Sequence, residues 1–457
     1  MSRQLRNRLA IFMMIFLLAF SVRLLTMQFM KMHLHDASWF QIGSYQMFEK
    51  HAENILSGRE RPFWIDDPSR TDLVQYPPAF PWWIALIFRV SGDHSVYAVQ
   101  RVQWVLDLFL SMFLITGIAV TAFGWRAAIA ASFLAAVSPL LAMYGAWPSS
   151  DAPTSWLVLG ATWMLLLAAK TSNVRWAIGS GLMLGVACWF RVNPLFLSVT
   201  WAFGLLLLLP ASWRERVRLS LALAMFAILL VVPITLRNAL VFHEFLPNGL
   251  NVGVNLWEGL GETDRGVAAG MVLGDQFMLE IERKELNLPP EYPITLAYPD
   301  GIRRDRKRVR DSLQVIAANP LWYAGVMGRR AVRLLKLAGE PAPYQGSAGI
   351  NVTSKKSLTP AWQGGVLAIL VDGLGMAQSV IRYSILLLLL PGVLLALRKN
   401  RLGSTLLLIT VFYYLLTCSV GHTEMRYALP MYGVLFVFAG VAVAGMIEAI
   451  KRRKASV

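Results

Sequence analysis

Apolar runs of about 20 residues recur along this chain, and each is long enough to cross a bilayer core of ~30 Å. Charged residues make up 15% of the chain, against roughly 25% in soluble domains. The sequence therefore predicts an all-α polytopic membrane protein with about 10–11 transmembrane helices. The ten clearest runs lie at residues 8–30, 98–123, 126–146, 152–170, 175–190, 193–210, 216–236, 379–397, 403–420 and 427–449.

Residues 77–91 form an ambiguous eleventh run, because they are apolar but short and contain three prolines. If this run does not cross, every short basic connection falls on one side of the membrane, as the positive-inside rule requires. We therefore expect a juxtamembrane helix at 77–91, two cytoplasmic termini, and a bacterial inner (plasma) membrane location. The net charge of +16 then reflects topology, so membrane lipids are expected partners and nucleic acid is not.

The predicted topology divides the chain into three regions. Residues 1–236 form an N-terminal transmembrane module that includes a first outer loop at 31–97. Residues 237–378 form a larger outer region, and residues 379–457 form the C-terminal transmembrane helices. Within the outer region, basic patterns at 303–318 and from Pro320 to about 338 predict amphipathic helices, the second suited to anionic lipid headgroups.

The first outer loop is acidic, aromatic and far longer than the roughly 2–8 residues that usually join two helices. Asp36 begins it, whereas Asp66 and Asp67 precede a proline and favour a turn. The predicted topology places this loop on the same side as the other unusual polar segments, which indicates an outward-facing site at the membrane surface. Those segments are 147–151, 190–194, 237–378 and 421–427.

The polar motifs resemble those of the GT-C superfamily of membrane glycosyltransferases. The closest likeness is to the family 39-like branch, which contains protein O-mannosyltransferases and the lipid A aminoarabinose transferase. Two departures are Ala37, where many relatives have Glu, and Asp151, where Glu is common. The motifs that carry the resemblance are Asp36 followed by Tyr76-Pro77-Pro78-x-x-Pro81, 101–107, Ser138-Pro139 through Ser150-Asp151, Arg191, Arg237-Asn238, 255–259 and Arg426-Tyr427-x-x-Pro430.

The resemblance implies a hexosyl- or pentosyltransferase with a polyprenyl-phosphate-sugar donor, a hydroxyl on a glycan, lipid or protein acceptor, and inversion at the anomeric carbon. Such chemistry needs a carboxylate base for the acceptor proton and cations for the phosphate leaving group. The expected catalytic residues are Asp36 and Asp151. The expected phosphate-binding residues are Arg191, Arg237 and Arg426, and the expected substrate-binding residues are Tyr76, Asn255 and Glu424.

Each site residue has a plainer alternative. Asp36 and Asp151 could cap helices, and Arg191 and Arg426 could extend to the interface along their stems. Glu424 could simply pair with Arg426. His422 is expected at the surface.

The intramembrane Asp107 fits either a functional or a helix-pairing role. No His, Asp and Glu set has convincing metal-ligand spacing, so no cofactor is assigned, and a divalent metal stays an open alternative. The rival function is a transporter or flippase of lipid-linked sugars. That rival would favour paired repeats or broken helices on both faces, and the sequence shows no repeat. A third possibility is a non-catalytic scaffold.

Overall fold

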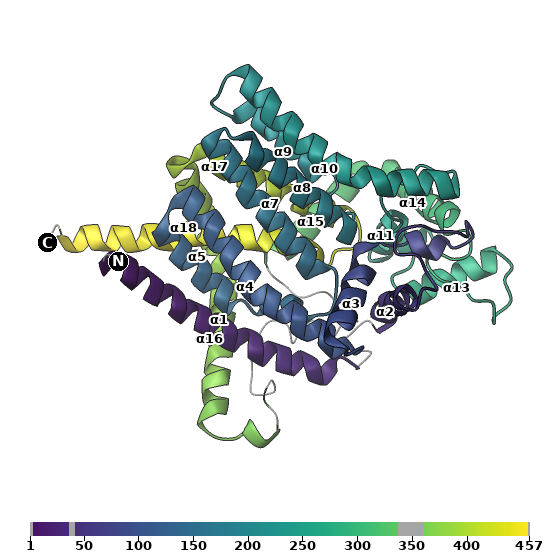
Figure 1. The fold of residues 1–457 in the computed structure, drawn as a ribbon, viewed down its shortest axis with the longest axis horizontal. Helices are drawn as coiled ribbons and strands as arrows, with labels where there is room; N and C mark the ends of the chain where they lie inside the picture. The colour runs from purple at the N-terminus through teal and green to yellow at the C-terminus, as the bar shows by residue number, and fades with distance from the viewer. Residues whose placement is uncertain (1–2, 36–41, 337–357, 359, 456–457) are drawn as a thin grey trace.

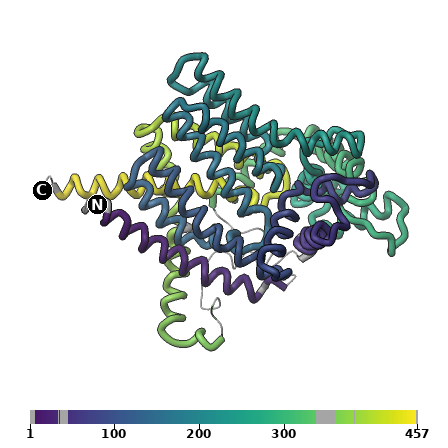
Figure 2. Tube along the Cα trace, in the orientation of Figure 1, coloured from purple at the N-terminus to yellow at the C-terminus, as the bar shows by residue number. Residues whose placement is uncertain are grey.

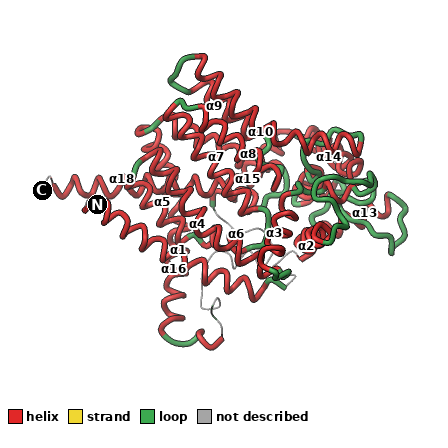
Figure 3. Tube along the Cα trace, in the orientation of Figure 1, coloured by secondary structure: helices red, strands yellow, loops and turns green. Residues whose placement is uncertain are grey.

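The computed structural model describes residues 3–35, 42–336, 358 and 360–455. Within these ranges all regular elements are helices, apart from an isolated β-bridge between Thr295 and Tyr298. Figure 3 shows that long loops gather at the end of the molecule near α13 and α14. The predicted all-α class is confirmed.

Six helices are long and apolar enough to cross a membrane, and two bent helix pairs raise the number to eight. Three shorter apolar helices have 12 to 17 residues, so the expected 10–11 spans are reached only if these also cross. The six are α1 (Arg3–His33), α4 (Val96–Phe123), α7 (Asp151–Thr171), α10 (Trp213–Phe242), α17 (Arg401–Val420) and α18 (Leu429–Ala455). The shorter helices are α3 (Ala79–Ser91), α8 (Val174–Phe190) and α9 (Leu197–Leu208).

The single helix expected at 126–146 is wrong, because it is broken into α5 (Trp125–Val137) and α6 (Pro139–Ala146), bent by 60°. Pro139 has no N–H to continue the hydrogen-bond ladder of α5. Ser138 instead starts a new helix, and its side chain accepts a hydrogen bond from the Leu141 N–H at 3.3 Å. The other bent element is α16 (Val366–Lys399), with a 42° bend between Ile381 and Tyr383.

α18 runs through the middle of the helix bundle and packs against α5, α7 and α16 (Figure 1). Small residues allow these close approaches, as is common between membrane helices. A Cβ on Gly440 would lie 2.7 Å from the Ala127 carbonyl oxygen, and one on Gly392 would lie 2.2 Å from that of Phe438. The intramembrane Asp107 binds Arg23 at 3.0 Å, Ser111 at 2.5 Å and Trp156 at 2.9 Å. Asp107 thus has the helix-pairing role.

The remaining elements gather at the end of the bundle opposite the two termini (Figures 1 and 2). The first outer loop contributes α2 (Ile42–Leu56), the 3₁₀ helix η1 (Thr71–Val74) and α3. The later outer region contributes α11 (Val252–Gly261), α12 (Asp264–Ala268), α13 (Asp275–Glu285), α14 (Gly301–Ala318) and α15 (Pro320–Leu335). α14 matches the basic helix expected at 303–318.

The two outer parts are tied together by backbone contacts. The Leu250 N–H donates to the Val74 carbonyl at 3.0 Å, and the Asn251 side chain donates to the Gln75 carbonyl at 3.0 Å. The Thr71 hydroxyl donates to the Ala297 carbonyl and accepts from the Gly301 N–H. The loop after α2 and the region before α14 therefore form one unit.

Not all basic residues of α15 face outward, where they could contact lipid headgroups. Arg330 is 2% exposed and binds Glu262 at 3.2 Å and the Ser419 carbonyl at 3.3 Å. The Tyr323 hydroxyl donates to the Val420 carbonyl. This face of α15 lies against α17 and closes one side of the outer region, so the headgroup interpretation is wrong for that face.

Candidate functional site

A cavity of about 370 Å³, here called the main cavity, lies where the bundle meets the outer region. It collects residues from eight segments of the sequence, from Tyr45 to Tyr427. The polar residues among its lining are Tyr45, Tyr76, Ser149, Ser150, Asp151, Arg191, Asn193, Asn251, Asn255, Glu258, Asp275, Tyr413, Thr417, His422, Glu424, Arg426 and Tyr427.

Asp151 and Arg191 form an ion pair in the wall of this cavity. Asp151 is the first residue of α7, and Arg191 directly follows the last residue of α8, so both side chains sit at the same end of the bundle. Asp151 is 2% exposed, and its Oδ2 atom has no hydrogen-bond partner among the described residues. A buried carboxylate oxygen without a donor is costly, and it is available to accept a proton or a hydroxyl hydrogen bond.

Two arginines meet at Tyr427. The Arg191 guanidinium lies 4.5 Å from the centre of the Tyr427 ring, and that of Arg426 lies 5.4 Å from it. Arg426 is also ion-paired to Glu424. Two planar cations, each held by a carboxylate and an aromatic ring, are well suited to bind a phosphate group between them.

A cluster of acids surrounds His422, next to Arg426 and its partner Glu424. His422 Nδ1 lies 2.5 Å from Glu262, and its Nε2 lies 3.5 Å from Glu424. Burial opposes protonation of His422, but the hydrogen bonds to these two carboxylates outweigh burial and raise its pKa to about 10. Burial also opposes ionisation of Glu424, but Arg426 and His422 lower its pKa to about 2. His422 and Glu424 are therefore both charged at neutral pH.

Glu258 and Asp275 complete the cluster as a coupled acid pair. Burial, followed by the charge of Asp275, raises the pKa of Glu258 to about 7, and burial with the charge of Glu424 raises the pKa of Asp275. Glu258 accepts a hydrogen bond from the Gly274 N–H at 3.1 Å, which joins α11 to the start of α13. At neutral pH this pair therefore holds a proton for part of the time.

The main cavity brings together six of the residues expected from sequence: Tyr76, Asp151, Arg191, Asn255, Glu424 and Arg426. Asp36 lies outside the described residues. Arg237 is elsewhere, since it lines a second cavity and donates to Asn238 at 2.8 Å and to the Phe63 carbonyl at 3.1 Å. His422 was expected at the surface, and this is wrong, because it is 6% exposed.

Some residues of the cavity were not predicted from the sequence. Glu258 lies inside the motif 255–259, but no pattern there distinguishes a cavity residue from a helix surface residue. Asp275, and Glu262, which binds the cavity residue His422, lie in a region without a recognisable motif. The sequence does carry a signal for Asn193, because it precedes Pro194 and this pair predicts a turn. In the structure the Asn193 side chain donates a hydrogen bond to the Tyr427 carbonyl at 3.0 Å.

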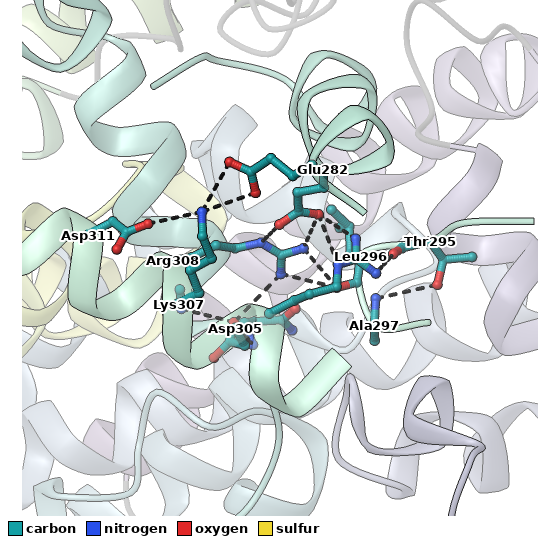
Figure 4. A network of polar contacts seen from close by, with 12 residues as sticks. Glu282, Thr295, Leu296, Ala297, Asp305, Lys307, Arg308 and Asp311 are labelled. Atoms are coloured by element: carbon teal, nitrogen blue, oxygen red, sulfur yellow. Dashed lines mark hydrogen bonds and ion pairs between the residues drawn. The ribbon is translucent and has the colours of Figure 1, made fainter. Parts of the chain in front are cut away.

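A polar network links α13, α14 and the segment around Leu296 (Figure 4). Glu282 on α13 accepts hydrogen bonds from Arg304 and Arg308 on α14. Arg308 also donates to the Leu296 carbonyl at 3.1 Å, and Asp305 accepts from the Gly253 N–H at 3.0 Å. Leu296 and the start of α11 line the cavity, so this network positions them.

Metal binding was left open by the sequence. Over the described ranges, no three His, Cys, Asp or Glu side chains are arranged to hold a metal ion. The acids of the main cavity are instead paired with cations or with each other. We therefore derive no chemical step through a metal.

The fold is similar to that of the GT-C membrane transferases, and the resemblance seen in the sequence is confirmed. Residues 75–236 match the family described as dolichyl-phosphate-mannose-protein mannosyltransferase, which is less than half of the chain. No curated protein sequence matches the chain.

Among solved structures, the chain is similar to the apo oligosaccharyltransferase of Archaeoglobus fulgidus. The TM-score is 0.54 at 13% identity, covering 98% of this chain and 51% of that one. The oligosaccharyltransferase AglB of the same organism, in complex with an inhibitory peptide and a dolichol-phosphate, gives 0.51 at 13% identity, covering 100% and 52%. The chain thus spans about half the length of these transferases.

The match to ArnT from Cupriavidus metallidurans in the apo state covers 87% of this chain and 72% of the ArnT chain. The identity is 15% and the TM-score is 0.33. That score is too low to support an argument about the site. The fold comparison therefore depends on the archaeal enzyme, and the chemistry depends on the residues described above.

Proposed function

We propose that this integral membrane protein transfers a sugar from a polyprenyl-phosphate donor to an acceptor hydroxyl, with inversion, on the non-cytoplasmic face. The observation that carries the proposal is the pairing of Arg191 and Arg426 around Tyr427 beside the buried carboxylate of Asp151. The arginines would bind the leaving phosphate, and a carboxylate would take the acceptor proton.

The chemistry balances without a cofactor. The acceptor oxygen forms a bond to the anomeric carbon as the bond from that carbon to the phosphate oxygen breaks, and the bonding pair leaves with the phosphate. The acceptor proton goes to a carboxylate, for which Asp36 and Asp151 are the candidates. Arg191 and Arg426 stabilise the charge that develops on the phosphate, which is the kind of preorganised electrostatic contribution that most lowers such barriers.

The position of the main cavity suits a lipid-linked donor. It opens at the boundary between apolar helices and the polar outer region, so a sugar phosphate could reach the arginines while its lipid chain stays among the helices. The AglB complex contains a dolichol-phosphate, which supports this class of donor by analogy of fold alone. We propose the same class of donor, a polyprenyl phosphate, for this chain. We also propose that both termini are cytoplasmic.

The experiment is a transfer assay in membranes with a labelled polyprenyl-phosphate sugar. Wild type is compared with Asp36→Asn at equal expression. We expect transfer by wild type and loss of transfer in Asp36→Asn if Asp36 is the base. Equal transfer by both proteins would remove Asp36 from the mechanism and leave Asp151 as the base.

The alternative is a flippase of lipid-linked sugars. It would also bind the donor phosphate, but it would move the lipid across the bilayer without breaking the bond to the sugar. Intact donor accessible on the opposite face, with no labelled product, would support this alternative and contradict the transferase.

A further inference from the structure

A second cavity of about 230 Å³ lies in the first outer loop, and we call it the loop cavity. It is formed by residues 47–82, from α2 to the start of α3, together with Arg237. Phe48, Tyr76 and Pro77 line both this cavity and the main cavity. The rings of Phe48 and Tyr76 are 5.0 Å apart, so aromatic side chains form part of the shared wall.

Aromatic side chains form one wall of the loop cavity. Phe63 stacks on Trp189 at 5.7 Å, and Trp82 lies 5.3 Å from the same Trp189 ring. The Trp82 Nε1 atom donates to the Pro62 carbonyl, which fixes the orientation of its ring. Trp64 is 40% exposed and lines the cavity. A rigid aromatic wall with a few polar groups is typical of a small-ligand site.

The charges in the cavity wall compensate each other. Four arginines (59, 61, 70 and 237) face four carboxylates (Glu60, Asp66, Asp67 and Asp72) in the lining. Arg70 binds Asp72 at 2.9 Å and Glu60 at 3.3 Å, and Arg61 lies 3.4 Å from Asp66. A charged ligand would therefore meet no surplus of opposite charge, whereas carboxylate and guanidinium groups together can bind the hydroxyls of a neutral ligand.

We propose that the loop cavity binds one neutral sugar residue of a glycan acceptor, next to the main cavity in which a hydroxyl of the same glycan is glycosylated. This inference depends on the proposed function and deepens it, since it selects a glycan over a lipid or a protein as the acceptor. The volume is below the ~300–1,000 Å³ of drug-sized sites, which fits a single sugar ring.

The surroundings of the cavity favour a glycan over a lipid. The side chains of Arg61 and Asp66 are 67% and 62% exposed, so that part of the lining faces water, and an alkyl chain would lose apolar contact there. A sugar ring offers an apolar face to Trp64 or Phe63 and hydroxyls to the charged groups. Tyr76 and Phe48 line both cavities, so they lie between this sugar and the main cavity that holds Arg191 and Asp151.

Binding is tested first without donor, by saturation-transfer NMR on the full chain in lipid nanodiscs free of sugar-headed detergent. The probes are the methyl glycosides of mannose, glucose and galactose. The variants are Trp64→Ala, Trp64→Phe and Asp151→Asn, with Trp213→Ala as the control for an exposed tryptophan at the start of α10. We expect Trp64→Ala to weaken binding of at least one glycoside by about three- to tenfold, the value of one aromatic contact. Trp64→Phe, Asp151→Asn and Trp213→Ala should bind as wild type.

Four results would overturn the inference. They are no binding of any glycoside, loss of binding in Asp151→Asn but not in Trp64→Ala, displacement of the glycoside by a serine-containing peptide, and tighter binding of glucose 6-phosphate than of the neutral glycosides.

In the transfer assay, Trp64→Ala should raise the acceptor KM and leave the donor KM unchanged. Transfer with an unchanged acceptor KM would reject the loop cavity alone, whereas glycoside binding at Trp64 without any transfer would reject the proposed function and the acceptor role with it.

Discussion

Arg191 and Asp151 form an ion pair in the wall of the main cavity, although Arg191 follows α8 and Asp151 begins α7. The pair has two consequences. It holds the guanidinium close to Tyr427 and Arg426, and it leaves one buried oxygen of Asp151 without a donor. A phosphate that binds Arg191 would compete with Asp151 and release its carboxylate beside the reacting sugar.

Asp151→Asn should lower kcat for sugar transfer by about 10²–10⁴-fold, the usual contribution of a positioned acid or base. Binding of polyprenyl phosphate should not weaken, because the neutral amide no longer competes for Arg191. The measurement is single-turnover transfer together with lipid binding. Glu448→Gln, which removes an exposed partner of Arg126, serves as the control. Wild-type kcat in Asp151→Asn would exclude a catalytic role for this carboxylate.

Arg191→Lys should keep a positive charge but lose the planar fork that binds two phosphate oxygens. We expect a fall of about 10²–10³-fold in kcat/KM for the donor, comparable with the loss of one preorganised donor in other enzymes. Arg191→Gln should be lower still. Equal activity of Arg191→Lys and wild type would show that only charge matters at this position, and would contradict bidentate binding.

Much of the architecture follows from the sequence, because apolar length and proline positions determine where helices lie. Residues Asp151, Arg191 and Arg426 could be placed together because each lies at the same end of a predicted span. Arg237 could not be excluded from that group, since its sequence neighbourhood does not reveal that its side chain binds Phe63 and Asn238.

The environment of His422 could not be predicted for a related reason. Its partner Glu262 is 160 residues away, in a region without a recognisable pattern. Contacts of that kind depend on the fold of α11–α15, which the periodicity of the sequence suggests only as separate helices. The break at Pro139 was visible in the sequence, but apolarity on both sides of it favoured a single span.

The pH dependence of stability should show the charge of His422. Its folded pKa of about 10 lies above the ordinary value of 6.5, so its stabilisation is complete below about pH 6.5 and is lost as the pH rises toward 10. The groups that face it are Glu262, Glu424, Glu258 and Asp275. The Tm difference between wild type and His422→Gln should therefore shrink between these pH values. A Tm difference independent of pH would show that His422 is not charged in the folded protein.

Asp107→Asn should destabilise the bundle strongly. It leaves Arg23 buried at 0% exposure, with two guanidinium nitrogens that already lack partners among the described residues. Breaking a buried ion pair typically costs about 3–5 kcal/mol, whereas an exposed pair contributes about 0–1 kcal/mol. Unfolding free energies in mixed micelles should be compared with those of Asp93→Asn, which removes an exposed pair with Arg101. Equal losses in the two variants would contradict the helix-pairing role.

Arg237→Gln tests whether Arg237 holds the segment around Phe63 or binds the donor phosphate. Its guanidinium holds the Phe63 carbonyl and stacks on the Phe63 ring at 5.1 Å, so the variant should lower Tm and disturb the loop cavity. Binding of polyprenyl phosphate should change far less than in Arg191→Gln. A selective loss of donor binding at unchanged Tm would restore Arg237 to the phosphate site.

The most direct test of the central claim is transfer of labelled sugar from a polyprenyl-phosphate donor in sealed proteoliposomes, with lipid binding followed in parallel for wild type and Asp151→Asn. The account predicts labelled, glycosidically bonded product with wild type, and bound lipid without product in the variant. Movement of intact donor across the bilayer by both proteins, with no new glycosidic bond, would contradict it.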